Sequence, residues 1–508
     1  MWLKTIDRLI NKVTMYRLLI YYLVGLLIAA IVLSAANVTH LNGVNIAISA
    51  MILVVACWLI NKIFAAMFNA PVNPESAIIT GLILALIMPP TPTGTGLLFL
   101  LAASGLAMAS KYILSYRNKH IFNPAAVAVF LTALGPHQSA SWWVATSSML
   151  PFILLGGILL TRKLSRADMV ISFLMSTTIT TAAFSLAMGS HLGTDLKDMF
   201  LNSAALFLGF VMLTEPYTSP DGRLKRIIYA VIVGIILAPL FHIGHYYSTP
   251  EFSLIIGNIF AFIVSSKVKL FPVLKSMRLI AKDTAEFVYD PGQDFKYKPG
   301  QYMEFTLQHT KTDSRGSRRY FTLASSPTEP NISIGVRFYK HGSSYKEALA
   351  ASERGDMVVA AQLAGDFTLP SDPKAKLVFV AGGVGITPFR SMIKYLLDKH
   401  EKRDIVLFYS VRSADYVAYR DVISQAENRM NLKVFFILSD DRDSKQLDGQ
   451  VVKGRLSAER VNKLVPDLMN RKVYMSGPPE MIRDMRSGLE EIGVSRVNIK
   501  VDFFSGYA

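Results

Sequence analysis

The stretch Leu377 to Arg390, LVFVAGGVGITPFR, decides the fold of the C-terminal half of this chain. The apolar run 377–382 predicts a buried strand, the glycines predict a tight turn, and the residues from about Phe389 onward predict a helix. In such a unit the glycines let a phosphate approach the backbone, and the helix N-terminus adds partial positive charge. The residues that we expect near the phosphates of a dinucleotide are Gly382, Gly383, Gly385, Thr387, Pro388 and Arg390.

Further strands follow this unit at spacings that suit a parallel sheet. Residues 405–412 (IVLFYSVR), 433–439 (KVFFILS) and 472–479 (KVYMSGPP) read as buried strands separated by helices. This alternation predicts an α/β doubly wound domain over 374–508. Arg412, at the end of the second strand, is the candidate contact for a 2′-phosphate; a single arginine leaves NADH and NADPH both open, and we favour NADH.

Residues 271–373 predict a different domain, a small antiparallel β-barrel. Residues 299–305 (PGQYMEF) and 319–327 (RYFTLASSP) read as strands, and 336–351 reads as a strand, a turn and a helix. The second strand would pack an aromatic ring on a flavin while an arginine and a hydroxyl meet its phosphate and ring edge, and the helix N-terminus would hold a pyrophosphate. A surface arginine or a serine-capped helix is ordinary when taken singly, so the interpretation depends on their combination. The residues expected at the flavin are Arg319, Tyr320, Phe321, Thr322, Gly342, Ser343 and Ser344.

In this order the motifs resemble the ferredoxin–NADP reductase family over nearly all of residues 273–508. The resemblance implies that the arginine–aromatic–threonine strand binds FAD and that the glycine loop binds NAD(P)H. It also implies that Ser476-Gly477-Pro478, where the family has Cys-Gly-Pro, lies under the nicotinamide, and that Phe504 in the tail DFFSGY (502–507) shields the flavin. Thr322, Ser476 and Phe504 are therefore the candidate catalytic residues, and no metal ion is implied.

The N-terminal half predicts a membrane domain over residues 1–270. Hydrophobic residues make up 51% of the 508-residue chain, and nearly uncharged runs recur as far as about Ser266. We predict about ten α-helical spans, at 17–36, 44–66, 76–89, 95–115, 123–135, 142–162, 168–188, 197–214, 226–246 and 252–266.

The distribution of charge predicts an orientation in the membrane. Lysine and arginine lie in or, as with Lys62, just before every second turn between spans, whereas the turns 37–43, 90–94, 136–141 and 247–251 contain neither residue. By the positive-inside rule, both termini are cytoplasmic, and the chain lies in the inner or cytoplasmic membrane as a multi-pass protein. The net charge of +16 then reflects topology signals, so we do not expect nucleic-acid binding.

The cysteine and histidine content restricts the redox cofactors. The single cysteine, Cys57, excludes disulfides, zinc knuckles and cysteine-ligated iron–sulfur clusters within this chain. Haem in the membrane would need histidines that face each other inside the spans. The histidines fall in turns or near helix ends instead, and His242 with His245 is the best remaining pair. A solvated helix end explains that pair better than a haem or an ion.

Two segments of the membrane half read as copies of each other. Aligning Ser76 with Ser203 brings Pro89 onto Pro216, each just past an apolar helix. The loop charges place the ends of the two copies on opposite sides, which predicts two inverted repeats with a ligand site between them. Prolines that break helices at membrane depth mark either a cofactor or ion contact or a simple helix end. These breaks are at 73–74, 89–92, 123–124 and 215–220.

The stretches SAIITGLILALIMPPTPTG (76–94), HIFNPAAVAV (120–129) and LTEPYTSP (213–220) resemble a pair of related membrane proteins, one from the sodium-translocating NADH:quinone reductase and the other from the Rnf complex. The resemblance implies ten helices in two inverted repeats and bound flavin, including FMN esterified to a threonine in a Ser-Gly-Ala-Thr motif. That motif is absent from the sequence. Thr146, which follows an alanine, is the nearest candidate for a membrane FMN site, and a non-covalent flavin stays open.

Together these features predict a membrane-bound flavin oxidoreductase. Electrons from NAD(P)H would pass through FAD into or across the membrane, to a membrane flavin, a quinone or a partner redox protein. Hydride transfer needs stacked rings and excluded water, and it needs no acid or base residue. The alternative is a redox-driven or redox-regulated transporter of ions such as Na⁺, or of flavin. The inverted repeats and broken helices fit that alternative equally well.

Overall fold

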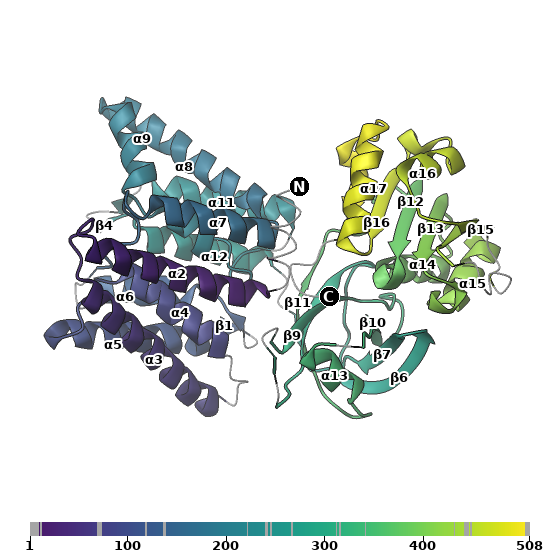
Figure 1. Cartoon of the computed structure of the whole chain (residues 1–508), viewed down its shortest axis with the longest axis horizontal. Helices are drawn as coiled ribbons and strands as arrows, with labels where there is room; N and C mark the ends of the chain where they lie inside the picture. The colour runs from purple at the N-terminus through teal and green to yellow at the C-terminus, as the bar shows by residue number, and fades with distance from the viewer. Residues whose placement is uncertain are drawn as a thin grey trace. The chain divides into compact units, whose positions relative to one another are not determined.

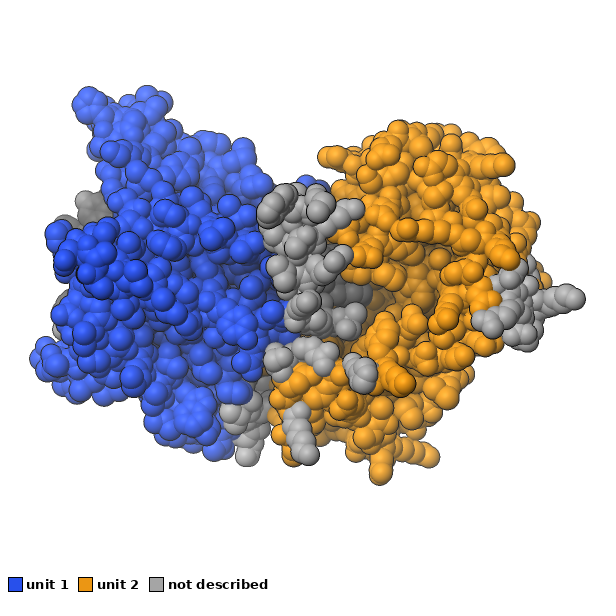
Figure 2. All heavy atoms as spheres, in the orientation of Figure 1, with its two compact units in different colours: residues 1–267, 507 blue, residues 268–506, 508 orange. Residues whose placement is uncertain are grey.

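The computed structural model divides the chain into two compact units, one up to residue 267 and one from residue 268, which Figure 2 shows in blue and orange. The sequence predicts this boundary at residue 270. The structure describes residues 10, 13–68, 74–116, 119–135, 139–220, 222–238, 242–243, 246–265, 268–310, 312–313, 316–340, 342–430, 432–440, 447 and 450–502.

The N-terminal unit is built from apolar helices and two short hairpins (Figure 1). Its helices are α2 (Met15–Ala35), α3 (Gly43–Met67), α4 (Pro74–Ile87), α5 (Gly94–Ile113), α6 (Pro124–Leu134), α7 (Leu150–Leu164), α8 (Ala167–Met188), α9 (Leu192–Leu201), α10 (Ala205–Phe207), the π-helix η1 (Leu208–Met212), α11 (Arg223–Leu237) and α12 (Pro250–Val264). The hairpins are β1 (Ser115–Tyr116) with β2 (Lys119–His120), and β3 (His242–Ile243) with β4 (Tyr246–Tyr247). Four of these helices, α2, α3, α5 and α8, are long and apolar enough to cross a membrane.

Three predicted spans differ from the helices observed. The span predicted at 142–162 begins at Leu150, because the preceding loop pairs with the end of α4. The N–H groups of Ser141 and Trp142 donate to the carbonyl of Ile87 at 3.0 and 2.9 Å, and the Trp143 indole donates to that of Ala85 at 3.1 Å. The last carbonyls of a helix lack partners within it, so a neighbouring loop can satisfy them.

The other two differences follow from local chemistry. The span predicted at 197–214 is divided into α9, the short α10 and the π-helix η1. The span predicted at 226–246 ends at Leu237, since Ala238 is extended, with ψ of 150°, and precedes Pro239. A residue before proline disfavours the helical conformation.

Both halves of the N-terminal unit contain a short hairpin followed by a helix that begins with proline. The hairpin β1–β2 leads to Pro124 of α6, and β3–β4 leads to Pro250 of α12. Helix α5 packs against α3 and α6, just as α11 packs against α8 and α12, and α6 packs against α12. These matched elements agree with an internal repeat, and its inverted orientation stays a prediction.

The first part of the C-terminal unit contains antiparallel strands in two sheets. One has the order β10-β7-β6 and the other β5-β11-β8-β9, so a single closed barrel stays a prediction. Buried aromatic side chains, including Phe287, Phe305 and Tyr345, fill the core of this part. Its elements are β5 (Lys269–Leu270), β6 (Val273–Ala281), β7 (Thr284–Asp290), β8 (Tyr302–Thr306), β9 (Arg318–Thr322), β10 (Ile332–Arg337), α13 (Ser344–Ala350) and β11 (Val359–Ala364).

The second part is a six-stranded parallel sheet with the order β15-β14-β13-β12-β16-β17. Helices α14 and α15 cover one face, and α16 and α17 cover the other (Figure 1), as predicted for a doubly wound sheet. The strand order reverses between β12 and β16, and ligands bind at such a switch point in open α/β sheets. The elements are β12 (Leu377–Gly382), η2 (Gly383–Ile386), α14 (Thr387–Asp398), β13 (Ile405–Val411), η3 (Ala414–Tyr416), α15 (Arg420–Met430), β14 (Leu432–Leu438), β15 (Gln450–Lys453), α16 (Ala458–Leu464), β16 (Lys472–Ser476), α17 (Pro479–Glu491) and β17 (Ile499–Val501).

Candidate active site

The glycine loop lies at the carboxyl end of β12, as predicted. Gly383 has a φ of +55°, a left-handed conformation that suits glycine. A 3₁₀ turn then leads into α14, whose first turn contains Pro388 and has no side-chain cap among the described residues. The Thr387 hydroxyl donates to the carbonyl of Val384 at 3.1 Å, so it stabilises the loop itself. An uncapped helix N-terminus beside glycine backbone fits the diphosphate of a dinucleotide.

The glycine loop is in direct contact with the loop that follows β16. A Cβ atom on Gly385 would lie 2.3 Å from the carbonyl oxygen of Ser476 and 2.7 Å from the nitrogen of Gly477. A Cβ on Gly382 would lie 2.8 Å from Cδ of Pro478. The structure therefore brings together the predicted nicotinamide segment Ser476–Pro478 and the predicted phosphate loop at the switch point of the sheet.

Ser476 is held by an acidic residue at the end of β17. Its side chain is buried, and its hydroxyl donates to Oδ2 of Asp502 at 2.9 Å. Burial raises the pKa of Asp502 to about 7; the charge of Asp366 adds to this shift, and the hydrogen bond from Ser476 opposes it. Phe504, the third candidate catalytic residue, lies outside the described residues.

The raised pKa of Asp502 predicts how stability changes with pH. An aspartate in an unfolded chain has a pKa of about 3.9. Between about pH 4 and pH 7 the folded chain keeps a proton that the unfolded chain loses, so stability falls as the pH rises through this range. We expect the melting temperature, followed by flavin fluorescence, to fall less between about pH 5 and pH 8 in Asp502→Asn than in the wild type. An equal fall in both proteins would contradict this assignment.

The predicted flavin strand β9 has two different faces. The Arg319 guanidinium lies 5.1 Å from the ring centre of Tyr345, and Phe321 packs against Phe305 and Tyr345 at centroid distances of 5.9 and 6.0 Å. On the other face, the Tyr320 hydroxyl donates to Oε1 of Gln362 at 3.1 Å. Strand alternation places Thr322, which is buried, on the face of Tyr320. Arg319 and Phe321 thus share one face, and Thr322 does not.

Helix α13 connects this strand to the predicted pyrophosphate cradle. Tyr345, on which Arg319 stacks, is its second residue, and Ser343 caps the helix by accepting the N–H of Lys346 at 3.3 Å. The N–H of Ser344 donates to Asp313 at 3.0 Å, so a carboxylate takes up one of the donors predicted for phosphate. Gly342 lies just before this turn, and binding of a pyrophosphate here stays a prediction.

The other two predicted phosphate contacts, Arg390 and Arg412, lie in different surroundings. Arg390 is buried and points to Glu329, with Nη2 3.0 Å from Oε1, so the expectation that it contacts the dinucleotide phosphates is not met in this structure. A carboxylate outcompetes a more distant anion for a guanidinium in this geometry. Arg412 is exposed just after β13, a position that suits contact with a 2′-phosphate, and that role stays a prediction.

Sequence reasoning missed Arg337, the last residue of β10. Its Nη1 lies 3.7 Å from where a Cβ on Gly383 would be, and its guanidinium lies 5.3 and 5.5 Å from the rings of Tyr339 and Tyr416. Its Nε is buried and has no hydrogen-bond partner among the described residues. A guanidinium held by rings beside the glycine loop fits an anion. A basic residue at a strand end gives no such signal until the loop is placed beside it.

Arg337 should therefore strengthen binding of the coenzyme. We expect Arg337→Gln to raise the Kd for NADH about tenfold, because a charge-assisted hydrogen bond to diphosphate is lost. The FAD content and the limiting rate should stay unchanged. Lys282→Gln is the matched control, since Lys282 is exposed and stacks on the same Tyr416 ring at 5.7 Å. Equal effects of the two substitutions in an NADH titration would contradict a specific contact.

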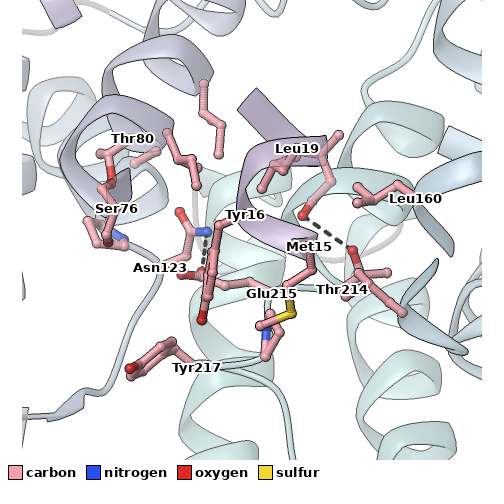
Figure 3. A pocket seen from close by; sticks show the side chains of 17 residues that line it. Met15, Tyr16, Leu19, Ser76, Thr80, Asn123, Leu160, Thr214, Glu215 and Tyr217 are labelled. Carbon is pink, nitrogen blue, oxygen red and sulfur yellow. Dashed lines mark hydrogen bonds between the residues drawn. The ribbon is translucent and has the colours of Figure 1, made fainter. Parts of the chain in front are cut away.

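The N-terminal unit contains an open pocket with a cavity volume of about 50 Å³, and the space between its walls is about 690 Å³ when the open solvent at its mouth is counted. Figure 3 shows Tyr16, Asn123 and Glu215 at its centre. It is lined by Met15, Tyr16, Leu19, Ser76, Ile79, Thr80, Ile83, Asn123, Pro124, Ala125, Leu160, Leu164, Val211, Thr214, Glu215, Pro216 and Tyr217. Most of these side chains are apolar and a few are polar, which is typical of a small-molecule site.

A hydrogen-bond network fixes the polar end of the pocket. Asn123 Nδ2 donates to Oε2 of Glu215 at 2.8 Å, and the Thr218 hydroxyl donates to the same oxygen at 3.1 Å. The backbone N–H of Asn123 donates to Asn258 at 2.9 Å, and the His120 Nε2 lies 3.5 Å from Glu215. The π-helix η1 ends three residues before Glu215, and π-helices are frequent at functional sites.

Some of the predicted helix breaks line the pocket and others do not. Asn123-Pro124 and Glu215-Pro216 line it, and residues 89–92 do not. Of the break at 73–74, Pro74 begins α4 and Asn73 lies outside the described residues. Thr146, the candidate for covalent FMN, is exposed in a turn, where its hydroxyl lies 3.2 Å from that of Ser148, and it is not among the residues that line the pocket.

Comparison with known proteins gives a separate match for each unit. Residues 144–270 match the model of the NQR2, RnfD, RnfE family, and residues 379–487 match the oxidoreductase NAD-binding domain. Over 216 residues the chain is 28% identical to the flavohemoprotein of Candida albicans, which covers 42% of this chain and 52% of that protein. Over 217 residues it is 27% identical to flavohemoprotein A of Dictyostelium discoideum, with coverages of 41% and 52%.

Among solved structures, the cytochrome P450 reductase GcoB of Amycolatopsis is similar, with a TM-score of 0.41 and 22% identity. The similarity covers 47% of this chain and 70% of that one. The chain spans about half the length of the curated relatives it matches.

These matches confirm the two resemblances predicted from the sequence. The C-terminal half contains an oxidoreductase domain that binds FAD and NAD(P)H. The N-terminal half contains a membrane domain, to which the four long apolar helices belong. Of the three membrane motifs, LTEPYTSP lies inside the matched range, and the other two precede it.

Proposed function

We propose that this chain takes hydride from cytoplasmic NAD(P)H and passes the electrons into its own membrane half. The contact between the glycine loop and the Ser476–Pro478 loop carries this proposal, because it joins the predicted phosphate and nicotinamide subsites. The same chain holds a membrane domain with a pocket, which provides a place for the electrons to go. FAD, when bound, supplies a ring that accepts hydride and releases electrons singly.

The C-terminal residues have binding and positioning roles in this proposal. Arg319 and Phe321 hold the flavin from one face of β9, and Thr322 ends the strand on the other face. Gly385 and Gly477 let the glycine loop and the Ser476–Pro478 loop pack backbone to backbone, so the two loops together can position the coenzyme. These residues orient two rings and exclude water, which is what hydride transfer requires of a protein.

The membrane pocket is the proposed site of the electron acceptor, a flavin or a quinone bound without a covalent link. Its apolar walls suit a flat ring system, and Glu215 with Asn123 offers hydrogen bonds at one end. A partner redox protein would need no such pocket. Covalent FMN at Thr146 receives less support, because Thr146 lies away from the residues that line the pocket.

The orientation follows the charges of the loops. Arg162 and Arg166 flank the turn between α7 and α8, and Arg223 and Lys225 begin α11. By the positive-inside rule this side is cytoplasmic, and both termini and the C-terminal unit lie there, in the inner or cytoplasmic membrane. NADH added to the outside of inverted membrane vesicles should therefore be oxidised, and NADH added to right-side-out vesicles should not.

Steady-state assays of the purified chain in mild detergent test the proposed reaction. NADH and NADPH are compared as donors, with ferricyanide as a soluble acceptor and a short-chain quinone as a membrane acceptor. We expect both acceptors to be reduced and NADH to be the better donor. Oxidation of neither coenzyme by the FAD-loaded chain would overturn the proposal.

A second candidate function, redox-driven ion transport, is favoured by one observation. The Glu215 carboxylate lies in a pocket where a π-helix and two helix breaks meet. A carboxylate at such a position can bind a cation or a proton. If NADH oxidation by proteoliposomes depends on sodium or accelerates with an uncoupler, electron transfer is coupled to ion movement; independence from both would exclude this candidate.

A further inference from the structure

One ion pair between a buried arginine and a partly buried glutamate connects the segment that follows the flavin strand to the helix that follows the glycine loop. Arg390 lies in the first turn of α14, and Glu329 lies in the segment 324–329, which comes just after β9. Arg390 Nη1 bonds to Oε2 of Glu329, and Nη2 lies 3.0 Å from Oε1, so the pair is bidentate. The Arg390 side chain is buried, and water therefore screens the pair weakly.

Hydrogen bonds from the same turn of α14 fix the rest of the segment. Arg390 Nη1 donates to the carbonyl of Ala324 at 3.1 Å, and the Ser391 hydroxyl donates to the carbonyl of Ser325 at 2.5 Å. The backbone N–H of Ser326 donates to Glu329 at 2.6 Å, which holds the carboxylate in place. Arg390 and Ser391 of α14 thus hold in place the segment that immediately follows the residues assigned to flavin binding.

The position of this ion pair and these hydrogen bonds gives them a geometric role. Toward its N-terminus, segment 324–329 continues into β9 with Phe321 and Thr322, and α14 continues into Gly383 and Gly385. A sliding movement between the segment and α14 would change the distance between the two cofactor-binding loops. A bidentate arginine–carboxylate pair is specific in distance and angle. A buried ion pair is a weak source of net stability, so its stronger effect is on geometry.

We propose that Arg390 and Glu329 are positioning residues that set the spacing between flavin and nicotinamide, and so determine the rate of hydride transfer more than the affinity for either cofactor. This inference rests on the proposed function, in which the C-terminal unit transfers hydride from NAD(P)H to FAD. A displacement of about 1 Å between reacting groups can lower a rate by two orders of magnitude.

The chain offers a matched control for a purely structural role. Arg471 is equally buried and forms a bidentate pair with Asp404, at 2.7 and 2.9 Å. Asp404 immediately precedes β13, and Arg471 immediately precedes β16, so this pair lies at the amino edge of the parallel sheet. The cofactor loops leave the opposite, carboxyl edge. Glu329→Gln therefore removes a bidentate pair near the cofactors, and Asp404→Asn removes one far from them, although Arg471 keeps its bond to Asp467 at 2.7 Å.

The experiment measures flavin reduction by NADH in a stopped-flow instrument with the full-length chain loaded with FAD. For Glu329→Gln we expect a limiting rate about tenfold below that of the wild type, a Kd for NADH changed by less than about twofold, and a larger isotope effect with 4-deuterated NADH. For Asp404→Asn we expect the limiting rate and the isotope effect of the wild type. Arg390→Lys, which keeps the charge and loses the bidentate geometry, should behave as Glu329→Gln does and replaces it if that variant does not fold.

Equal losses of rate in Glu329→Gln and Asp404→Asn would overturn the inference, because they would indicate general destabilisation. A raised Kd for NADH with an unchanged limiting rate would also overturn it and would assign the pair to coenzyme binding. Failure of the wild-type chain to reduce its FAD with NADH overturns the proposed function itself, and this result is seen before any variant is compared.

Discussion

Replacing Gly385 with alanine should lower the rate of flavin reduction by NADH about a hundredfold or more. The new Cβ would lie 2.3 Å from the carbonyl oxygen of Ser476 and 2.7 Å from the nitrogen of Gly477. Both atoms belong to the backbone, so relief requires the glycine loop and the Ser476–Pro478 loop to separate. We assign these two loops to the phosphates and the nicotinamide, and their separation would misplace the hydride donor. Stopped-flow reduction of the bound FAD by NADH measures this effect.

Gly493→Ala is the control for this substitution. Gly493 has a φ of +99°, so alanine is strained there, yet a Cβ would have open space around it. Gly493→Ala should lose some stability and keep its rate of flavin reduction. In Gly385→Ala the FAD content should stay at the wild-type level, because the flavin strand β9 is not involved. A normal reduction rate in Gly385→Ala would contradict the assignment of the two loops.

Tryptophan in place of Leu19 should reduce electron transfer to a quinone at least about tenfold and leave ferricyanide reduction unchanged. Leu19 lines the membrane pocket from α2, and Figure 3 shows it across the pocket from Ser76 and Thr80. An indole there would occupy space that a flat acceptor needs. Ferricyanide is water-soluble and can take electrons from FAD without entering the membrane unit. The ratio of the two activities therefore isolates the second step from the first.

Leu18→Trp is the matched control, since Leu18 is the preceding residue of the same helix, is half-buried like Leu19 and does not line the pocket. Both substitutions add the same side chain at neighbouring positions of α2. Only Leu19→Trp should change the ratio of quinone to ferricyanide reduction. If the two variants behave alike, the pocket is not the route to the acceptor.

The sequence predicted the C-terminal fold well because its signals are local. The apolar runs that become β12, β13, β14 and β16 are bounded by glycine, proline or polar turns, and strands of a parallel sheet are buried on both faces. The glycine loop was recognised because Gly383 needs a left-handed backbone and Gly385 a close neighbour. Glycine is the residue type that meets both requirements, so the sequence shows them directly. Division of the antiparallel strands into two sheets depends on pairing between distant strands, which residue type does not encode.

Helix ends in the membrane half were less predictable, because hydropathy does not show tertiary hydrogen bonds. The hydropathy of Trp142 and Trp143 predicts the start of a span, yet they belong to a loop that satisfies carbonyls at the end of α4. The π-helix η1 likewise has an ordinary apolar sequence. The prolines that follow Asn123 and Glu215 mark both residues in the sequence, whereas the hydrogen bond between them joins residues that are far apart in the chain.

The partners of single side chains in the site are likewise not visible in the sequence. Arg390 was expected at a phosphate because of its place after the glycine loop, and its actual partner, Glu329, is distant in sequence. Arg337 was missed because a basic residue at a strand end is common, and its place beside Gly383 depends on the packing of β10 against η2. The hydrogen bond between Asp313 and the N-terminus of α13 also joins residues that are distant in sequence. Long-range partners decide where a charged side chain points.

The most direct test of the central claim, that electrons from NAD(P)H reach the membrane half, is an anaerobic titration of the purified full-length chain with NADH. Flavin and quinone are first quantified after denaturation, and absorption spectra then follow reduction. The account predicts that the chain takes up about two equivalents of NADH per FAD, since FAD accepts one hydride and a second carrier in the membrane pocket accepts two further electrons. Leu19→Trp should take up about one equivalent. Uptake of a single equivalent by the wild type, with no electron transfer to added quinone, would contradict the account.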